Sequence, residues 1–212
     1  MKYIIMCGGT YPDWDEPRQL IRINGEPIVA RTIRLLREAG VTDIAISTND
    51  NRFEQFGVPI LRHENRFEGH DDNGGGSWVE GFYLTDEPVC YLLGDVIFSP
   101  DSIKTIVNTD TQDVEFFASA PPFSSDYIKP YAEPFAFKVK KQWYFKTAIE
   151  AVKALEAVGM FNRRPIAWEL WQVIKGTRLN EVITNYTVIN DYTCDIDYPE
   201  EAELIAEKLK DA

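Results

Sequence analysis

The sequence has few of the residues that build metal centres, disulfide frameworks or membrane spans. It contains two histidines, His63 and His70, and this count excludes a histidine-rich metal site. The three cysteines are odd in number and scattered beside apolar runs, which indicates buried thiols in a reducing compartment. No apolar stretch approaches the ~20 residues of a transmembrane helix. The opening MKYIIMCGG lacks the features of a signal peptide, so we expect a cytoplasmic protein with no membrane insertion.

Positive charge is also scarce. Against 34 Asp and Glu stand 22 Lys and Arg, which gives a formal net charge of −12. We therefore expect no nucleic-acid partner. Phosphates can still bind such a chain where a few cations or a metal ion gather in one cleft. The 212 residues suit a single domain, which we divide into a nucleotide-binding part (1–120), an acceptor-covering part (121–185) and a closing strand and helix (186–212).

The first twenty residues contain the first candidate site. An apolar run over 2–7 predicts a buried strand of a parallel sheet, and it ends in Gly8-Gly9-Thr10. A cation then follows a rigid lead-in at Pro17-Arg18. A phosphate can approach the backbone closely at such a turn. Taken alone, the glycine pair is an ordinary structural turn.

A second glycine-rich stretch precedes a predicted helix. Gly74, Gly75 and Gly76 lead into Ser77, which is a good N-cap for a helix over 77–83. The segment is either a flexible surface loop or bare backbone against which a nucleotide base lies. Both interpretations stay open.

Two places later in the chain offer carboxylates. Asp95 follows the apolar strand 89–93, where open α/β sheets place functional groups. It either caps the next turn or binds a metal ion, and we favour the metal-ligand role. Asp195 and Asp197 alternate on an extended segment and so share a face. Asp197 is either the N-cap of the helix that starts at Pro199 or a cation ligand, and these two roles are compatible.

The segment between these sites has a different character. Residues 121–135 contain four prolines and several aromatics and predict an irregular cover, followed by a strand over 135–139 and a helix over 143–158. Its aromatic side chains are expected in the core. This half should close over the sheet and select an acceptor. Four cations in it could bind the acceptor, and no motif shows which of them does: Lys129, Lys138, Arg163 and Arg164.

The combined motifs resemble the nucleotidyltransferases of the GT-A-like fold, which include sugar-phosphate nucleotidyltransferases and small-molecule cytidylyltransferases. The resemblance covers the first hundred residues and the last twenty. It rests on Cys7-Gly8-Gly9-Thr10, Pro17-Arg18-Gln19-Leu20, Asn24-Gly25-Glu26-Pro27-Ile28, Gly74-Gly75-Gly76-Ser77, Gly94-Asp95-Val96 and Asp195-Ile196-Asp197-Tyr198-Pro199-Glu200. It implies an α/β three-layer sandwich with a mostly parallel central sheet and an acceptor-covering insertion.

The resemblance also implies a reaction. A nucleoside triphosphate would transfer its NMP unit to a phosphorylated small molecule such as a sugar phosphate, for example in making a surface polysaccharide precursor, and pyrophosphate would leave. Arg18 and Asp95 would be catalytic, and Asp95 and Asp197 would hold Mg²⁺, because Asp197 fits the family's Asp-x-Pro-Glu pattern better than Asp195. The nucleotide would lie on Cys7, Gly8, Gly9, Thr10, Gly74, Gly75, Gly76 and Ser77.

The chain departs from the family pattern in its phosphate loop. Residues 11–16 carry three acidic groups in place of further glycines, and Arg18 replaces the family's lysine. Two alternatives therefore remain: a glycosyltransferase of related fold, and a nucleotide-binding module without activity. The sequence does not fix the oligomeric state, and a homodimer is one option.

Overall fold

The structure is a computed structural model, and it describes residues 1–8, 15–63, 76–119, 132–181 and 185–209. Four of the predicted nucleotide-binding residues lie outside these ranges: Gly9, Thr10, Gly74 and Gly75. Most of the irregular segment 121–135, including Lys129, also lies outside them.

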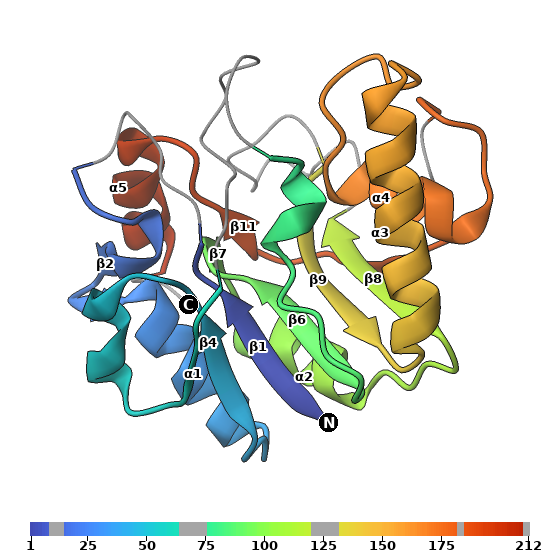
Figure 1. The fold of residues 1–212 in the computed structure, drawn as a ribbon. Helices are drawn as coiled ribbons and strands as arrows, with labels where there is room; N and C mark the ends of the chain where they lie inside the picture. The colour runs from blue at the N-terminus through green and yellow to red at the C-terminus, as the bar shows by residue number, and fades with distance from the viewer. Residues whose placement is uncertain (9–14, 64–75, 120–131, 182–184, 210–212) are drawn as a thin grey trace.

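A seven-stranded sheet forms the centre of the molecule (Figure 1). β1 (Lys2–Met6) runs parallel to both neighbours, β4 (Ile44–Ser47) and β6 (Val89–Leu93). β9 (Pro134–Val139) is antiparallel to the strands on either side. The strand order is β10-β8-β9-β6-β1-β4-β5, where the outer strands are β5 (Ile60–Leu61), β8 (Val114–Ser119) and β10 (Thr187–Ile189). The predicted mostly parallel α/β sheet is confirmed.

Helices cover both faces of this sheet and so make the predicted three layers (Figure 1). On one face lie α1 (Ile28–Glu38) and α2 (Pro100–Asn108), whose apolar sides pack onto β1, β4 and β6. On the other face lie α3 (Gln142–Ala157) and α4 (Ala167–Lys175). Phe116 of β8, Phe137 of β9 and Trp171 of α4 are fully buried between the sheet and these helices. These three aromatic side chains are core residues, as the sequence predicts, whereas Trp143 on α3 is 67% exposed and lies outside the core.

A smaller third cluster carries the closing elements of the chain. It joins the hairpin of β2 (Arg22–Ile23) and β3 (Glu26–Pro27) to α5 (Pro199–Lys208) and to the antiparallel pair β7 (Val96–Ile97) and β11 (Cys194–Asp195). The hairpin turns at Asn24 and Gly25, whose φ angles of 50° and 84° are those that an Asn-Gly turn supplies. Through this cluster the end of the chain packs beside its beginning.

Three short 3-10 turns complete the described elements, and the first of them is η1 (Arg18–Leu20). η2 (Asn51–Phe56) follows β4, and η3 (Trp78–Gly81) follows Ser77. The predicted helix over 77–83 is wrong, because only this 3-10 turn forms and the Ser77 side chain makes no capping hydrogen bond. Val79 and Phe82 are instead buried against the sheet, and their packing fixes the path of the segment.

Lys138 has a structural role. It is 7% exposed on β9, and its ammonium donates to the carbonyls of Ile106 at 2.9 Å, Val107 at 2.8 Å and Thr109 at 2.6 Å. These carbonyls belong to the C-terminal end of α2, where a cation is favoured. Burial lowers the pKa of Lys138. All three donors point into the fold, so Lys138 is not placed to bind an acceptor.

We expect Lys138→Met to lower the free energy of unfolding by about 2 kcal/mol, because three buried carbonyls lose a charged donor. Urea unfolding measures this. Lys140→Met is the matched control, since Lys140 is exposed and makes one long contact of 3.8 Å with Asp110. It should change stability by less than ~0.5 kcal/mol. Equal effects of the two variants would contradict the capping role.

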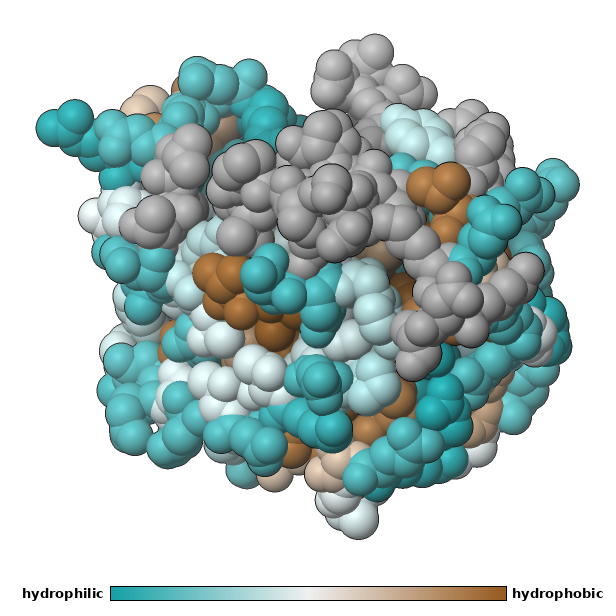
Figure 2. Space-filling view, turned by 180° about the vertical axis from the view of Figure 1, so that it is seen from behind, coloured by the Kyte–Doolittle hydropathy of each residue, from teal (hydrophilic) through white to brown (hydrophobic). Residues whose placement is uncertain are grey.

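No helix among the described residues is long and apolar enough to cross a membrane. Viewed from behind, the surface is mostly hydrophilic, and hydrophobic residues form separate small patches on the part that is coloured (Figure 2). The three cysteines are buried and free, as predicted.

Candidate active site

Asp95 lies at the carboxyl end of β6, next to the end of β1. The strands pair in register up to Met6 and Leu93, and the Gly94 N–H then donates to the Met6 carbonyl at 3.0 Å. The Ile196 N–H donates to the Asp95 carbonyl at 3.1 Å, which extends the β7–β11 pairing. The backbone of Asp95 is therefore fixed from both sides, at the sheet edge where the sequence predicts it.

Arg18 joins the two predicted metal ligands. Its guanidinium is 3% exposed and contacts Asp95 at 2.7 Å (Nη2 to Oδ2) and Asp197 at 2.9 Å (Nη1 to Oδ1). Nη1 also donates to the Ile196 carbonyl at 2.5 Å. The 3-10 turn η1 (Arg18–Leu20), which follows Pro17, sets this position. Three residues singled out from the sequence thus meet, although 179 positions separate Arg18 from Asp197.

Asp197 is not the N-cap of α5. The N-cap is Tyr198, and the Glu201 carboxylate accepts from the N–H groups of Asp197 at 2.7 Å and Tyr198 at 3.2 Å. The Asp197 carboxylate accepts from Arg18 Nη1 at 2.9 Å. The N-cap interpretation of Asp197 is therefore wrong.

Glu133 is a residue of the site that the sequence did not reveal. It is 4% exposed, and it lies just before β9. Ser119 fixes its backbone twice: the Ser119 N–H donates to the Glu133 carbonyl at 2.9 Å, and the Glu133 N–H donates to Ser119 Oγ at 2.8 Å. It falls in the proline-rich stretch, and the one available signal was a carboxylate immediately before a buried strand.

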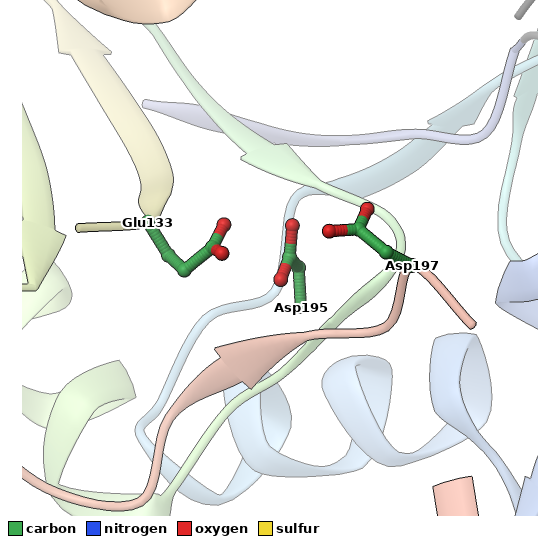
Figure 3. A group of neighbouring side chains, drawn as sticks. All are labelled: Glu133, Asp195 and Asp197. Atoms are coloured by element: carbon green, nitrogen blue, oxygen red, sulfur yellow. The ribbon is translucent and has the colours of Figure 1, made fainter. Parts of the chain in front are cut away.

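Three carboxylates converge beside Arg18. Ligand atoms of Glu133, Asp195 and Asp197 lie within 4.8 Å of one another, and Figure 3 shows the three side chains turned toward a common space. Asp195 and Asp197 share a face, as their alternation predicts. Carboxylate oxygens are the ligands that Mg²⁺ prefers in proteins, so this donor set fits a hard divalent cation.

Cys7 and Gly8, which begin the first glycine segment, lie at the same edge. Cys7 is buried, its N–H donates to the Ser47 carbonyl at 2.9 Å, and its Sγ lies beside Gly94. Burial and the nearby charge of Asp95 raise the pKa of Cys7 well above its usual value, which keeps the thiol protonated. Gly8 follows with partial exposure. A contact of this segment with a nucleotide stays a prediction.

Comparison with known proteins identifies the family. The family described as "MobA-like NTP transferase domain" matches residues 3–140, about two thirds of the chain. The chain belongs to this family. It is accordingly a nucleotidyltransferase, as the motifs predicted, and the general reaction is nucleotidyl transfer. The matched segment includes Arg18, Asp95 and Glu133, whereas Asp195 and Asp197 lie beyond it.

Two solved structures share the fold of this nucleotidyltransferase. A Bacillus anthracis protein assigned as a glucose-1-phosphate thymidylyltransferase, solved with sucrose, has a TM-score of 0.55 at 17% identity over 100% of this chain and 96% of its own. The inositol-1-phosphate CTP transferase of T. maritima has a TM-score of 0.58 at 14% identity over 100% of this chain and 97% of its own. At these identities they confirm the GT-A-like fold alone. No curated protein matches the sequence.

One cation of the covering part of this nucleotidyltransferase reaches the second glycine segment. Arg164 Nη2 donates to the Gly76 carbonyl, whereas Arg163 pairs with the buried Glu169 at 2.8 Å. Ser77 follows Gly76 with its Oγ buried. Of the four cations that the sequence offered for the acceptor, Arg164 is the one that the described structure connects to a predicted nucleotide-binding residue.

The acidic loop of the nucleotidyltransferase is described only at its end. Asp15 and Glu16 are exposed. The hydrogen bond with Asp50 raises the pKa of Arg52, and the charge of Glu16 adds to this shift. Charges on the surface are screened by water, so Asp15 and Glu16 repel a triphosphate less than buried groups would. Asp13 lies outside the described residues.

Proposed function

We propose that this nucleotidyltransferase joins an NMP unit from an NTP to a phosphorylated sugar or polyol and releases pyrophosphate. The observation that carries the proposal is the meeting of Arg18, Asp95 and Asp197 at the carboxyl ends of β1 and β6. This edge is where open α/β sheets bind nucleotides. Gly8 and a cluster of carboxylates lie beside it, and groups of these kinds suit the binding of a triphosphate together with a cation.

The triphosphate would lie over the turn that begins at Gly8, with the base against Gly76 and Ser77. Backbone N–H groups at Gly8, Gly9 and Thr10 would bind phosphate oxygens, since no side chain of the two glycines blocks their approach. Arg18 would bind the phosphates through its planar fork. Support for these assignments comes from the described positions of Gly8, Arg18 and Gly76.

The acceptor's phosphate oxygen would attack the α-phosphorus. A bond forms between that oxygen and phosphorus, the bond to the oxygen bridging the α- and β-phosphates breaks, and pyrophosphate carries away the electron pair. The protein contributes alignment of the two phosphates and stabilisation of charge, and it needs no covalent intermediate.

We assign the divalent cation to Asp95 and Asp197, with Glu133 and Asp195 as neighbouring carboxylates. Among the described residues, the carboxylate oxygens that lie within 4.8 Å of one another belong to Glu133, Asp195 and Asp197, and Asp95 is joined to Asp197 through Arg18. A bound Mg²⁺ would neutralise charge on the triphosphate and on the leaving pyrophosphate. The chain's own contribution is to hold these carboxylates in place through the β7–β11 pairing and the Ser119 contacts.

The acceptor class is supported by the structural neighbours. One is named for glucose 1-phosphate and the other for inositol 1-phosphate, which are both phosphate monoesters of a polyhydroxylated ring. We extend this class to the present chain, and with it a role in supplying nucleotide-activated precursors for polysaccharides. Arg164 is the described cation best placed to connect acceptor binding to the nucleotide.

A pyrophosphate-release screen tests the proposal. Each of CTP, UTP, GTP, dTTP and ATP is mixed with Mg²⁺, the protein and a panel of hexose and polyol phosphates. We expect one nucleotide–acceptor pair to release pyrophosphate in proportion to the nucleotide consumed. Asp95→Asn is the negative control for each positive pair.

Other outcomes would favour the alternatives. Release of a free nucleoside diphosphate from a sugar nucleotide would favour a glycosyltransferase. Stabilisation of the fold by a nucleotide, with no pyrophosphate from any pair, would favour the module without activity. Either result would contradict the proposed transfer.

A further inference from the structure

Arg18 contacts the two carboxylates that are proposed to hold the divalent cation. Its two terminal nitrogens contact one oxygen of Asp95 and one oxygen of Asp197, at 2.7 and 2.9 Å. Both carboxylates are assigned above to the cation. The guanidinium and the cation therefore compete for the same negatively charged groups.

The burial of Arg18 makes this competition strong. An exposed ion pair is screened by water and contributes little, but Arg18 is 3% exposed, and its partners are 17% and 20% exposed. Coulomb interactions over less than 3 Å are large where water is excluded. A cation that approaches these carboxylates while Arg18 is in place meets a like charge at the same oxygens.

The geometry points to Arg18 as an internal counter-ion of the site, and we propose that it holds Asp95 and Asp197 until a nucleotide binds. The phosphates of the nucleotide would then accept hydrogen bonds from the guanidinium, and the two carboxylates would bind the divalent cation. Arginine suits this exchange because its fork binds carboxylate and phosphate in the same way. The inference rests on the proposed function, since it assumes that phosphate and cation bind at this edge.

The consequence is an order of binding. Without nucleotide, the protein should bind a divalent cation weakly, because Arg18 must leave its two partners first. Removal of the Arg18 charge should therefore tighten cation binding, although the same change removes a phosphate ligand. A merely structural arginine would not produce this result, because its loss would loosen the site and weaken binding.

The test is a titration of nucleotide-free protein with Mn²⁺, followed by the EPR signal of the free ion. Arg18→Gln removes the charge and keeps a donor for the Ile196 carbonyl. We expect its dissociation constant for Mn²⁺ to be at least tenfold lower than that of the wild type. Arg18→Lys should lie between them, because a single ammonium is a point charge without the fork that bridges two carboxylates.

Arg34→Gln is the matched control. Arg34 also pairs with two carboxylates, Glu26 at 2.8 Å and Glu38 at 3.0 Å, but on the exposed side of α1. This variant should bind Mn²⁺ as the wild type does. If Arg18→Gln is unfolded without divalent ions, Mn²⁺ should restore its circular dichroism, and Arg34→Gln should show no such dependence.

Equal Mn²⁺ affinities in the wild type and Arg18→Gln would overturn the inference, as would weaker binding by the variant. The titration contains no nucleotide, so it is independent of turnover. If Arg18→Gln binds Mn²⁺ more tightly but the pyrophosphate screen is negative, the counter-ion role of Arg18 is supported and the proposed transferase activity is rejected. Equal affinities with a positive screen would reject the counter-ion alone.

Discussion

Asp95→Asn should lower kcat by about a thousandfold and leave the protein folded. The change removes one negative charge from the group that is proposed to hold the cation, and a loss of about 4 kcal/mol of transition-state stabilisation corresponds to this factor. Asparagine has nearly the same shape, and its carbonyl oxygen can still accept from Arg18. Pyrophosphate release measures the loss of activity, and circular dichroism with thermal unfolding measures the retained fold.

Asp101→Asn is the control for this prediction. Asp101 lies in the first turn of α2, its side chain is 83% exposed, and it pairs with Lys104 at 2.9 Å. The same chemical change there should leave kcat within about twofold. Undiminished Mg²⁺-dependent turnover in Asp95→Asn would remove Asp95 from the site.

Gly94→Ala should reduce both stability and activity. An added Cβ would lie 2.3 Å from the Met6 carbonyl oxygen, 2.9 Å from Cys7 Sγ and 3.0 Å from Gln19 Cγ. The nearest atom belongs to the backbone of β1, and the Gly94 N–H is bonded to that same oxygen. The ends of β1 and β6 and the turn η1 must therefore separate, which moves Arg18 away from Asp95.

We expect the Gly94 variant to lose about 2 kcal/mol of unfolding free energy, as overpacking commonly costs. Its kcat/KM should fall about a hundredfold, because shifts of about 1 Å in an active site have such effects. Gly159→Ala is the control: Gly159 follows α3 at φ 70°, and nothing lies within 4 Å of its added Cβ. It should lose about 1 kcal/mol through backbone strain and keep its activity. Full activity in Gly94→Ala would show that this contact does not position the site.

Much of the fold could be predicted from local patterns. The run Val89–Leu93 forms β6 with the predicted bounds, and Ser99 caps α2 by accepting from the Ser102 N–H at 2.8 Å. Such features depend on neighbours within a few positions. The position of Asp95 follows from them, because the end of a buried parallel strand defines a sheet edge.

The remaining features depend on contacts between distant segments. The pairing of Arg18 with Asp197 requires the hairpin, α5 and β11 to pack together. Glu133 reaches the site only because β8 and β9 pair and Ser119 binds its backbone. The sequence offers Lys138 as an acceptor candidate, but its contacts with the carbonyls at the end of α2 depend on how α2 packs beside β9. No local sequence pattern predicts these contacts between distant segments.

Analysis of the products by ³¹P NMR tests the central claim most directly. The protein is incubated with Mg²⁺ and the nucleotide–acceptor pair found in the screen. We predict one new unsymmetrical diphosphate, in which the α-phosphorus of the NTP is joined to the acceptor's phosphate, together with one equivalent of pyrophosphate. Consumption of NTP to free NMP or NDP, with the acceptor's phosphate resonance unchanged, would contradict the account.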